Sequence, residues 1–235
     1  MRSAAKFLAS VLLATSVAVS ASGCVSLELN VARTPSSAYA GPPAESLSGL
    51  WEEQIAARPG SSGFRLVADG LEAFALRAML ARSAEHTLDI QYYIIHSDDT
   101  GTLLAHEVIR AADRGVRVRI LLDDIYAAEA DQTLLALDSH PSIEIRLFNP
   151  WRRRSGPMGR VIDFLASAGR LNQRMHNKLF AADGAAVVLG GRNIGDEYFV
   201  RDQDLDFRDL DVLAVGPVAR AASQSFDAYW NSEFS

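Results

Sequence analysis

Residues 174–183 read Arg-Met-His-Asn-Lys-Leu-Phe-Ala-Ala-Asp, and the chain continues with Gly190-Gly191-Arg192-Asn193. Two apolar runs, 179–182 and 185–189, are joined by Asp183-Gly184. Asp-Gly between two such runs predicts a β-hairpin, since both residues tolerate positive φ. Side chains alternate between the faces of a strand, so we expect His176 and Lys178 to project to the same side.

An imidazole beside an ammonium suits a phosphate site. Lys178 supplies a point charge for non-bridging oxygens, and His176 supplies a nucleophile or proton carrier near neutral pH. Asn193 can add an amide donor, while glycines let the backbone approach a ligand closely. The alternative is a strand with two surface polar residues. That interpretation is favoured when an H-x-K pattern occurs alone. The candidate substrate-binding residues are Gly190, Gly191, Arg192 and Asn193.

A second stretch, Asp209-Leu210-Asp211 followed by an apolar run and Gly216-Pro217, makes the pattern more specific. H-x-K-x4-D, a trailing G-G-x-N and a D-x-D strand that ends in Gly-Pro resemble the phospholipase D superfamily. The resemblance implies that His176 and Lys178 are catalytic and that Asp209 orients the His176 imidazole. A carboxylate on the far ring nitrogen would fix the tautomer and stabilise the imidazolium. Asp211 is the second candidate for that task, and the alternative for both is an exposed pair on an edge strand.

Asp183 completes the motif and counts among the catalytic candidates, although its turn position indicates a structural role. Other runs, spread over residues 60–235, resemble the bacterial cardiolipin synthases of the C-like branch. Members of that branch carry two lobes with one motif each, so this chain corresponds to the first lobe. These runs are Ser62–Leu66, Asp69–Ala73, Leu88–Ile94, Ala111–Val118, Leu121–Asp124, Ile145–Pro150 and Gly190–Phe199.

The resemblance implies phosphatidyl transfer or phospholipid hydrolysis through a phosphohistidine, without a metal or other cofactor. A second lobe, from a homodimer or a missing C-terminal half, would supply a second histidine. One alternative is a dimeric nuclease of the same superfamily, against which the acidic charge and the run from Gly190 to Phe199 both count. The other is a truncated, non-catalytic lipoprotein, which predicts a large exposed apolar face.

The first residues resemble a lipoprotein signal peptide. Arg2 and Lys6 precede an uncharged apolar run that is too short to span a membrane. Ala21-Ser22-Gly23-Cys24 resembles a bacterial lipobox, and Cys24 is the only cysteine. We expect a signal peptide over 1–23, a lipidated Cys24 with a tether over 24–59, and the phospholipase D-like domain over 60–235. The anchor predicts a periplasm-facing membrane attachment, and Val25 favours the outer membrane.

Charge limits the partners. The net charge is −6, which argues against general nucleic-acid binding and leaves a phospholipid as the expected substrate. A local exception is Arg152-Arg153-Arg154, with Arg160, Arg170 and Arg174 following. This basic segment is interpreted as a loop that either draws anionic headgroups toward the site or is simply solvated.

Alternating elements predict an α/β lobe with a mixed, largely parallel sheet flanked by helices. Asp69-Gly70 and Asp98-Asp99-Thr100 are helix starts, and Gly115 is a helix stop. The predicted strands are 87–95, 116–122, 143–148, the two motif strands and 209–215, and the predicted helices are 69–83, 98–114, 130–137 and 217–229.

Overall fold

The structure is a computed structural model that describes residues 31–42, 45–127, 131–152, 156–199 and 207–235. The expected signal peptide, Cys24 and the first residues of the expected tether lie outside the described residues. Within the described ranges, no helix combines the length and the apolar character needed to cross a membrane.

The described residues form a seven-stranded sheet in the order β1-β7-β6-β5-β2-β3-β4. An α/β fold with a mixed sheet is therefore confirmed. Parallel pairing, expected to dominate, is confined to β2-β3 and β3-β4, and the other four pairings are antiparallel. For β5-β6 the cause is local, because the Asp183-Gly184 turn between them is too short for a parallel crossover. The strands are β1 Gly63–Val67, β2 Thr87–Tyr92, β3 Arg117–Asp123, β4 Ile143–Phe148, β5 Leu179–Ala182, β6 Ala186–Gly190 and β7 Asp211–Val215.

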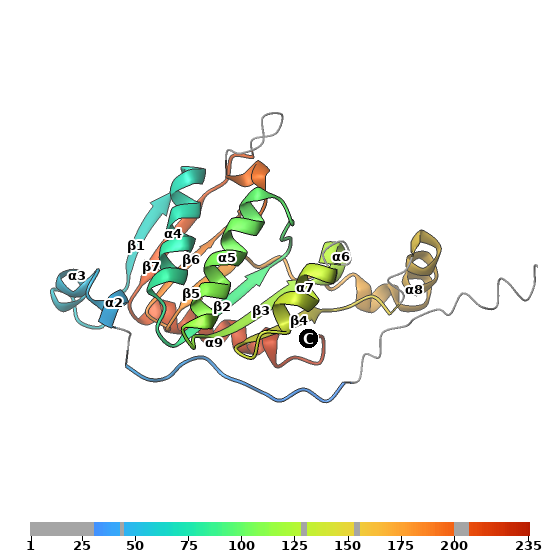
Figure 1. Ribbon diagram of the computed structural model, residues 1–235, viewed down its shortest axis with the longest axis horizontal. Helices are drawn as coiled ribbons and strands as arrows, with labels where there is room; N and C mark the ends of the chain where they lie inside the picture. Colours follow the sequence, from blue (N-terminus) through green and yellow to red (C-terminus); the bar gives the residue numbers. More distant parts are fainter. Residues whose placement is uncertain (1–30, 43–44, 128–130, 153–155, 200–206) are drawn as a thin grey trace, which may run out of the picture. The chain divides into compact units, whose positions relative to one another are not determined.

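Helices cover both faces of this sheet. Helices α4 and α5 lie side by side on one face, and α9 lies on the other (Figure 1). Alternation along β5 explains the two layers, since Phe180 packs in the core cluster that includes residues of α4 and α5, while Leu179 and Ala181 pack in the cluster that includes residues of α9. The helices are α2 Glu45–Ser48, α3 Glu52–Ala56, α4 Gly70–Ser83, α5 Asp99–Asp113, α6 Asp124–Ala127, α7 Asp131–Asp138, α8 Gly156–Leu171 and α9 Pro217–Trp230, with a 3-10 turn η2 Asp196–Tyr198.

The chain divides into two compact units. Among the described residues, one contains 31, 151–152 and 156–168, and the other contains those between 32 and 150 and between 169 and 235, with the whole sheet. The prediction of a loop after Arg152 is wrong, because α8 fills most of this segment. Its apolar residues recur at helical spacing, a signal outweighed in the sequence by the neighbouring arginines. Ser167 has non-helical φ −140° and ψ 27°, so the helix is kinked there.

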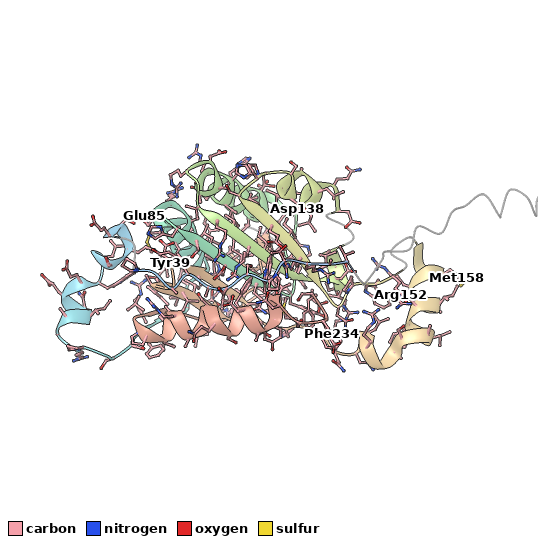
Figure 2. The ribbon with its side chains drawn as sticks, turned by 90° about the horizontal axis from the view of Figure 1, so that it is seen from below. Tyr39, Glu85, Asp138, Arg152, Met158 and Phe234 are labelled. Carbon is pink, nitrogen blue, oxygen red and sulfur yellow. The ribbon has the colours of Figure 1, made fainter. Side chains whose placement is uncertain are left out.

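Residues 32–42, within the expected tether, are bound along the larger unit. The Ser36 amide donates to Asn231 Oδ1 over 3.1 Å, and Asn231 Nδ2 donates back to the Ser36 carbonyl over 2.9 Å. The Ala38 amide donates to Asp227 Oδ2 over 2.7 Å. Tyr39 stacks on His86 with ring centroids 4.5 Å apart. Figure 2 shows this extended segment, here called the strap, running beside α9.

Candidate active site

His176 and Lys178 lie in an extended segment just before β5, not on the predicted strand. The paired part of β5 begins at Leu179, which pairs with Gln91 and Leu189. The motif residues therefore lie just beyond the N-terminal end of this strand. The His176 side chain is exposed, whereas Lys178 is 5% exposed. The two side chains therefore meet different surroundings instead of sharing one open face.

The Lys178 ammonium is desolvated and ready to receive an anion. Burial lowers the pKa of Lys178, and the charge of Asp209 partly opposes this effect. Nζ donates to the His176 carbonyl over 2.8 Å, its one hydrogen bond to the described residues. An ammonium has three N–H groups, so two donors are left for phosphate oxygens.

Tyr93 lies close to both motif side chains and was not recognised from the sequence. Its ring centroid is 4.7 Å from that of His176 and 5.4 Å from Lys178 Nζ. Burial raises the pKa of the Tyr93 hydroxyl, with the charge of Asp123 adding to the effect, so the phenol stays protonated and can donate. The signal available was its position at the end of a predicted strand, where functional side chains gather.

Asp123, at the end of β3, fixes the segment that leads into His176. Its carboxylate accepts from the Met175 amide over 2.9 Å, from Arg174 Nη1 over 3.1 Å and from the Ile125 amide over 2.9 Å. Burial raises the pKa of Asp123, and the Met175 amide and Arg174 oppose this effect. Asp123 is therefore a positioning residue for the backbone next to His176, and no spacing in the sequence indicated it.

Asp209 and Asp211 have different environments. Asp209 is half-buried, its Oδ1 accepts from the Leu210 amide over 2.7 Å, and its charge acts on Lys178. Among the described residues no hydrogen bond joins Asp209 to His176, so its orienting role stays a prediction. The Asp211 carboxylate is fully buried, with Arg77 Nη2 at 3.0 Å and Arg192 Nη1 at 3.5 Å. Asp211 is thus engaged inside the domain.

Two of the candidate substrate-binding residues, Arg192 and Asn193, bond to neighbouring segments of the chain. Arg192 is 2% exposed and donates to the carbonyls of Val67 and Tyr198. Asn193 accepts from the Ile94 amide over 3.2 Å and donates to the Tyr198 hydroxyl over 2.8 Å. These contacts connect the end of β6 to neighbouring segments, and a ligand contact of either side chain stays a prediction.

Gly190 and Gly191 provide room for carboxylates. A Cβ at Gly190 would overlap Asp211, and one at Gly191 would overlap the Asp209 carboxylate. The close approach expected of these glycines therefore occurs, but the group that approaches is an acidic side chain of the same chain.

Asp183 lies at the opposite end of β5 from His176. Four strand residues separate the two ends, roughly 13 Å of strand. Its carboxylate accepts from the backbone amides of Glu85, His86 and Thr87 over 2.6–2.9 Å. This geometry places Asp183 apart from the other catalytic candidates and gives it a structural task at the start of β2.

His96 has a carboxylate partner, with its Nε2 3.3 Å from Glu197 Oε1. It also borders a cavity of about 200 Å³ between the sheet, α5 and α7. Aliphatic residues such as Ile90, Leu104 and Leu137 form most of the lining. Such a cavity suits an apolar group and not a phosphate.

The described residues contain no group of three or more His, Cys, Asp or Glu side chains placed to hold a metal ion. What the edge at His176 offers instead is an exposed imidazole, a desolvated ammonium and a phenol, with a carboxylate that acts on the ammonium. This set can bind a phosphate and attack it.

Comparison with known proteins identifies the family of this chain. The family described as "Cardiolipin synthase, PLD-like domain" matches residues 77–230. Cardiolipin synthase C of Escherichia coli K12 is 50% identical over 173 residues, which cover 73% of this chain and 36% of that protein. An uncharacterized protein of Helicobacter pylori 26695 is 41% identical over 184 residues, covering 78% and 36% of the two chains. The chain thus spans about a third of the length of these relatives.

Solved structures show the same fold. NucT from Helicobacter pylori aligns with a TM-score of 0.55 and 17% identity, over 73% of this chain and 98% of that one. Phosphatidylserine synthase of Haemophilus influenzae aligns with a TM-score of 0.53 and 14% identity, over 79% and 41%. With the family match over more than half of its residues, this chain belongs to the cardiolipin synthase, phospholipase D-like domain family.

Proposed function

We propose that this domain catalyses phosphatidyl transfer between phospholipids, with His176 as the nucleophile. The observation that carries the proposal is that an exposed His176 imidazole and a buried Lys178 ammonium both lie against the Tyr93 ring, whose centroid is 4.7 Å from that of His176 and 5.4 Å from Lys178 Nζ. Similarity to a cardiolipin synthase at 50% identity supports a phospholipid substrate. Phosphatidylglycerol is the donor that such chemistry would use.

The reaction has two steps. A ring nitrogen of His176 attacks phosphorus, and the N–P bond forms as the P–O bond to the headgroup alcohol breaks. A second imidazole donates the proton that the departing alkoxide needs. An acceptor hydroxyl then attacks phosphorus, its proton passes to the second imidazole, and the N–P bond breaks. Lys178 offsets charge on the phosphate oxygens throughout.

The second imidazole has to come from outside this motif. His86, His96, His106 and His140 all lack a lysine two positions later. The relatives are about three times as long as the matched region, which leaves room in them for a second lobe. We propose that a second phospholipase D-like lobe, as another copy of this chain or as a separate segment, supplies it.

The test uses vesicles of labelled phosphatidylglycerol and the purified 235-residue protein, with His176→Ala as the matched variant. We expect cardiolipin from the wild-type chain and none from the variant, and a phosphatidyl adduct on His176 by mass spectrometry after a denaturing quench at alkaline pH, because the N–P bond is labile in acid. Phosphatidic acid as the only product would change transfer to hydrolysis. Equal product from both proteins, or cleavage of plasmid DNA without lipid products, would overturn the proposal.

The membrane attachment is part of the proposal. Cys24 follows an apolar leader, which supports lipidation and a position in the cell envelope facing the periplasm, with the outer membrane favoured. Labelled palmitate should enter the wild-type chain and not the Cys24→Ser variant, and equal labelling of both would contradict the anchor.

A further inference from the structure

Helix α8 exposes an apolar stripe. Met158, Val161, Ile162 and Leu165 follow the i, i+3, i+4, i+7 spacing that puts side chains on one helix face. All four are exposed, Leu165 at 77% and Met158, labelled in Figure 2, at 71%. Surface helices of globular proteins turn such a stripe toward the core.

The polar side of the same helix is the enclosed one. Asp163, on the face opposite Leu165, is 3% exposed. Its Oδ2 accepts from the Arg152 amide over 2.7 Å, within the same compact unit. The orientation of α8 is therefore the reverse of the usual one, and the apolar stripe requires a partner.

Charge identifies the kind of partner. Residues 151–170 contain five arginines and one aspartate, although the chain as a whole carries −6. Arg152 is exposed, and Arg160 lies within the helix. An apolar stripe in an arginine-rich segment that also carries the aromatic residues Trp151 and Phe164 matches the surface of an anionic bilayer, where headgroups meet the cations and acyl chains meet the stripe.

We propose that the stripe of α8, formed by Met158, Val161, Ile162 and Leu165, inserts into the interfacial layer of an anionic phospholipid bilayer. The helix has 16 residues, about 24 Å, too short to span the hydrocarbon core, so it lies along the surface. The kink at Ser167 separates the inserting segment from the end of the helix. This inference rests on the proposed function, since it names the surface from which the lipid substrate is taken.

The experiment places an environment-sensitive fluorophore on the stripe. In a full-length Cys24→Ser background, the Leu165→Cys variant is labelled with nitrobenzoxadiazole. Leu135→Cys is the matched control, since Leu135 is a leucine of α7 that is 70% exposed. Vesicles contain phosphatidylcholine alone or with a quarter of phosphatidylglycerol.

With the anionic vesicles we expect a blue shift and quenching by brominated acyl chains at position 165, and neither at 135. The double variant Met158→Ser/Ile162→Ser should weaken the response at 165 on the order of tenfold or more. No shift at 165 would overturn the inference. So would a shift that needs no vesicles and grows with protein concentration, because a second copy would then cover the stripe.

The two proposals can fail separately. Adding His176→Ala to the labelled protein should abolish turnover and leave the fluorescence response unchanged. If α8 inserts but the wild-type chain turns over no lipid, the proposed membrane insertion stands and the proposed function fails. If the chain turns over lipid but α8 does not insert, only the proposed membrane insertion fails.

Discussion

Asp209 and Asp211 are separated by one residue and differ in burial and in the cations they face. Asp211 neutralises two buried guanidinium groups, those of Arg77 and Arg192. Asp209 is half-buried and acts on the Lys178 charge. The D-x-D pattern therefore combines a structural carboxylate with one available to the site.

Substituting each aspartate by asparagine separates the two roles. Asp211→Asn leaves two buried cations without a counter-charge and should lower the free energy of unfolding by about 3 kcal/mol. Asp209→Asn should change it by less than about 0.5 kcal/mol, and should lower kcat at least tenfold. Urea unfolding and lipid turnover measure the two effects, and an equal loss of stability in both variants would contradict the assignment.

Lys178 predicts a pH dependence. Burial lowers the pKa of its ammonium, so the charge is lost at a lower pH than in an exposed lysine. Activity that needs this charge is present below that pKa and falls as the pH rises through it, which places the alkaline limb of kcat/KM below the ordinary lysine value. In Lys178→Arg the guanidinium stays charged, so this limb should move upward. A limb that stays in place would assign it to another group.

The motif letters could be predicted from the sequence, but the contacts around them could not. Tyr93 directly follows β2 and Asp123 ends β3, and no spacing along the chain reports which strand ends lie next to each other in the sheet. Arg192 and Asn193 show the same limit. Their polarity indicated ligand binding, and the sequence did not reveal that they also bond to carbonyl, amide and hydroxyl partners of the same chain.

Among the elements, β5 connects the candidate site to the structural turn. His176 and Lys178 precede its first residue, and Asp183 follows its last. Asp183 has φ 52°, a conformation that asparagine also tolerates, while its carboxylate binds three amides at the start of β2. Its effect on the site is therefore exerted through the strand.

Asp183→Ala should lower the free energy of unfolding by about 3 kcal/mol, because three amides lose a charged acceptor. Asp183→Asn is the matched variant, since it keeps an acceptor oxygen and the turn preference, and should lose less. Turnover per folded molecule should be unchanged in both. Thermal unfolding and kcat are the measurements, and a kcat loss in a fully folded Asp183→Asn protein would restore a direct catalytic role.

Sequence patterns predicted the elements unevenly. The hairpin at Asp183-Gly184 and the caps at Asp69 and Asp98 were confirmed, because each depends on a local conformational preference. Strand pairing depends on distant partners, and the share of parallel pairs was overestimated. Helix α8 was missed because its apolar period lies inside a basic segment, where charge alone suggests a loop.

At the scale of the larger unit, the strap ties the N-terminal side of the domain to α9. Arg117 Nη2 donates to the Ser37 carbonyl over 2.6 Å, and Arg146 Nη2 donates to that of Thr34 over 2.7 Å. Most of these bonds use backbone groups of the strap. Hydrophobic periodicity carries no information on them, so the sequence suggested only a tether.

Asn231→Ala should loosen the strap, because it removes both reciprocal bonds to Ser36. We expect faster tryptic cleavage after Arg33, while the unfolding midpoint shifts only slightly. Asn231→Asp is the control that keeps the acceptor for the Ser36 amide and should be intermediate. Mass spectrometry of timed digests gives the rates, and identical rates in all three proteins would mean that the strap is released independently of Asn231.

The spacing within H-x-K-x4-D has a geometric meaning in this fold. The four residues between Lys178 and Asp183 are the whole of β5, so the spacing of the motif equals the length of this strand. One residue more or less would reverse the facing of every later side chain in the strand. Chimeras of distant relatives should therefore fold when the crossover lies outside this interval. Chimeras in which the crossover changes the length of the interval should not fold.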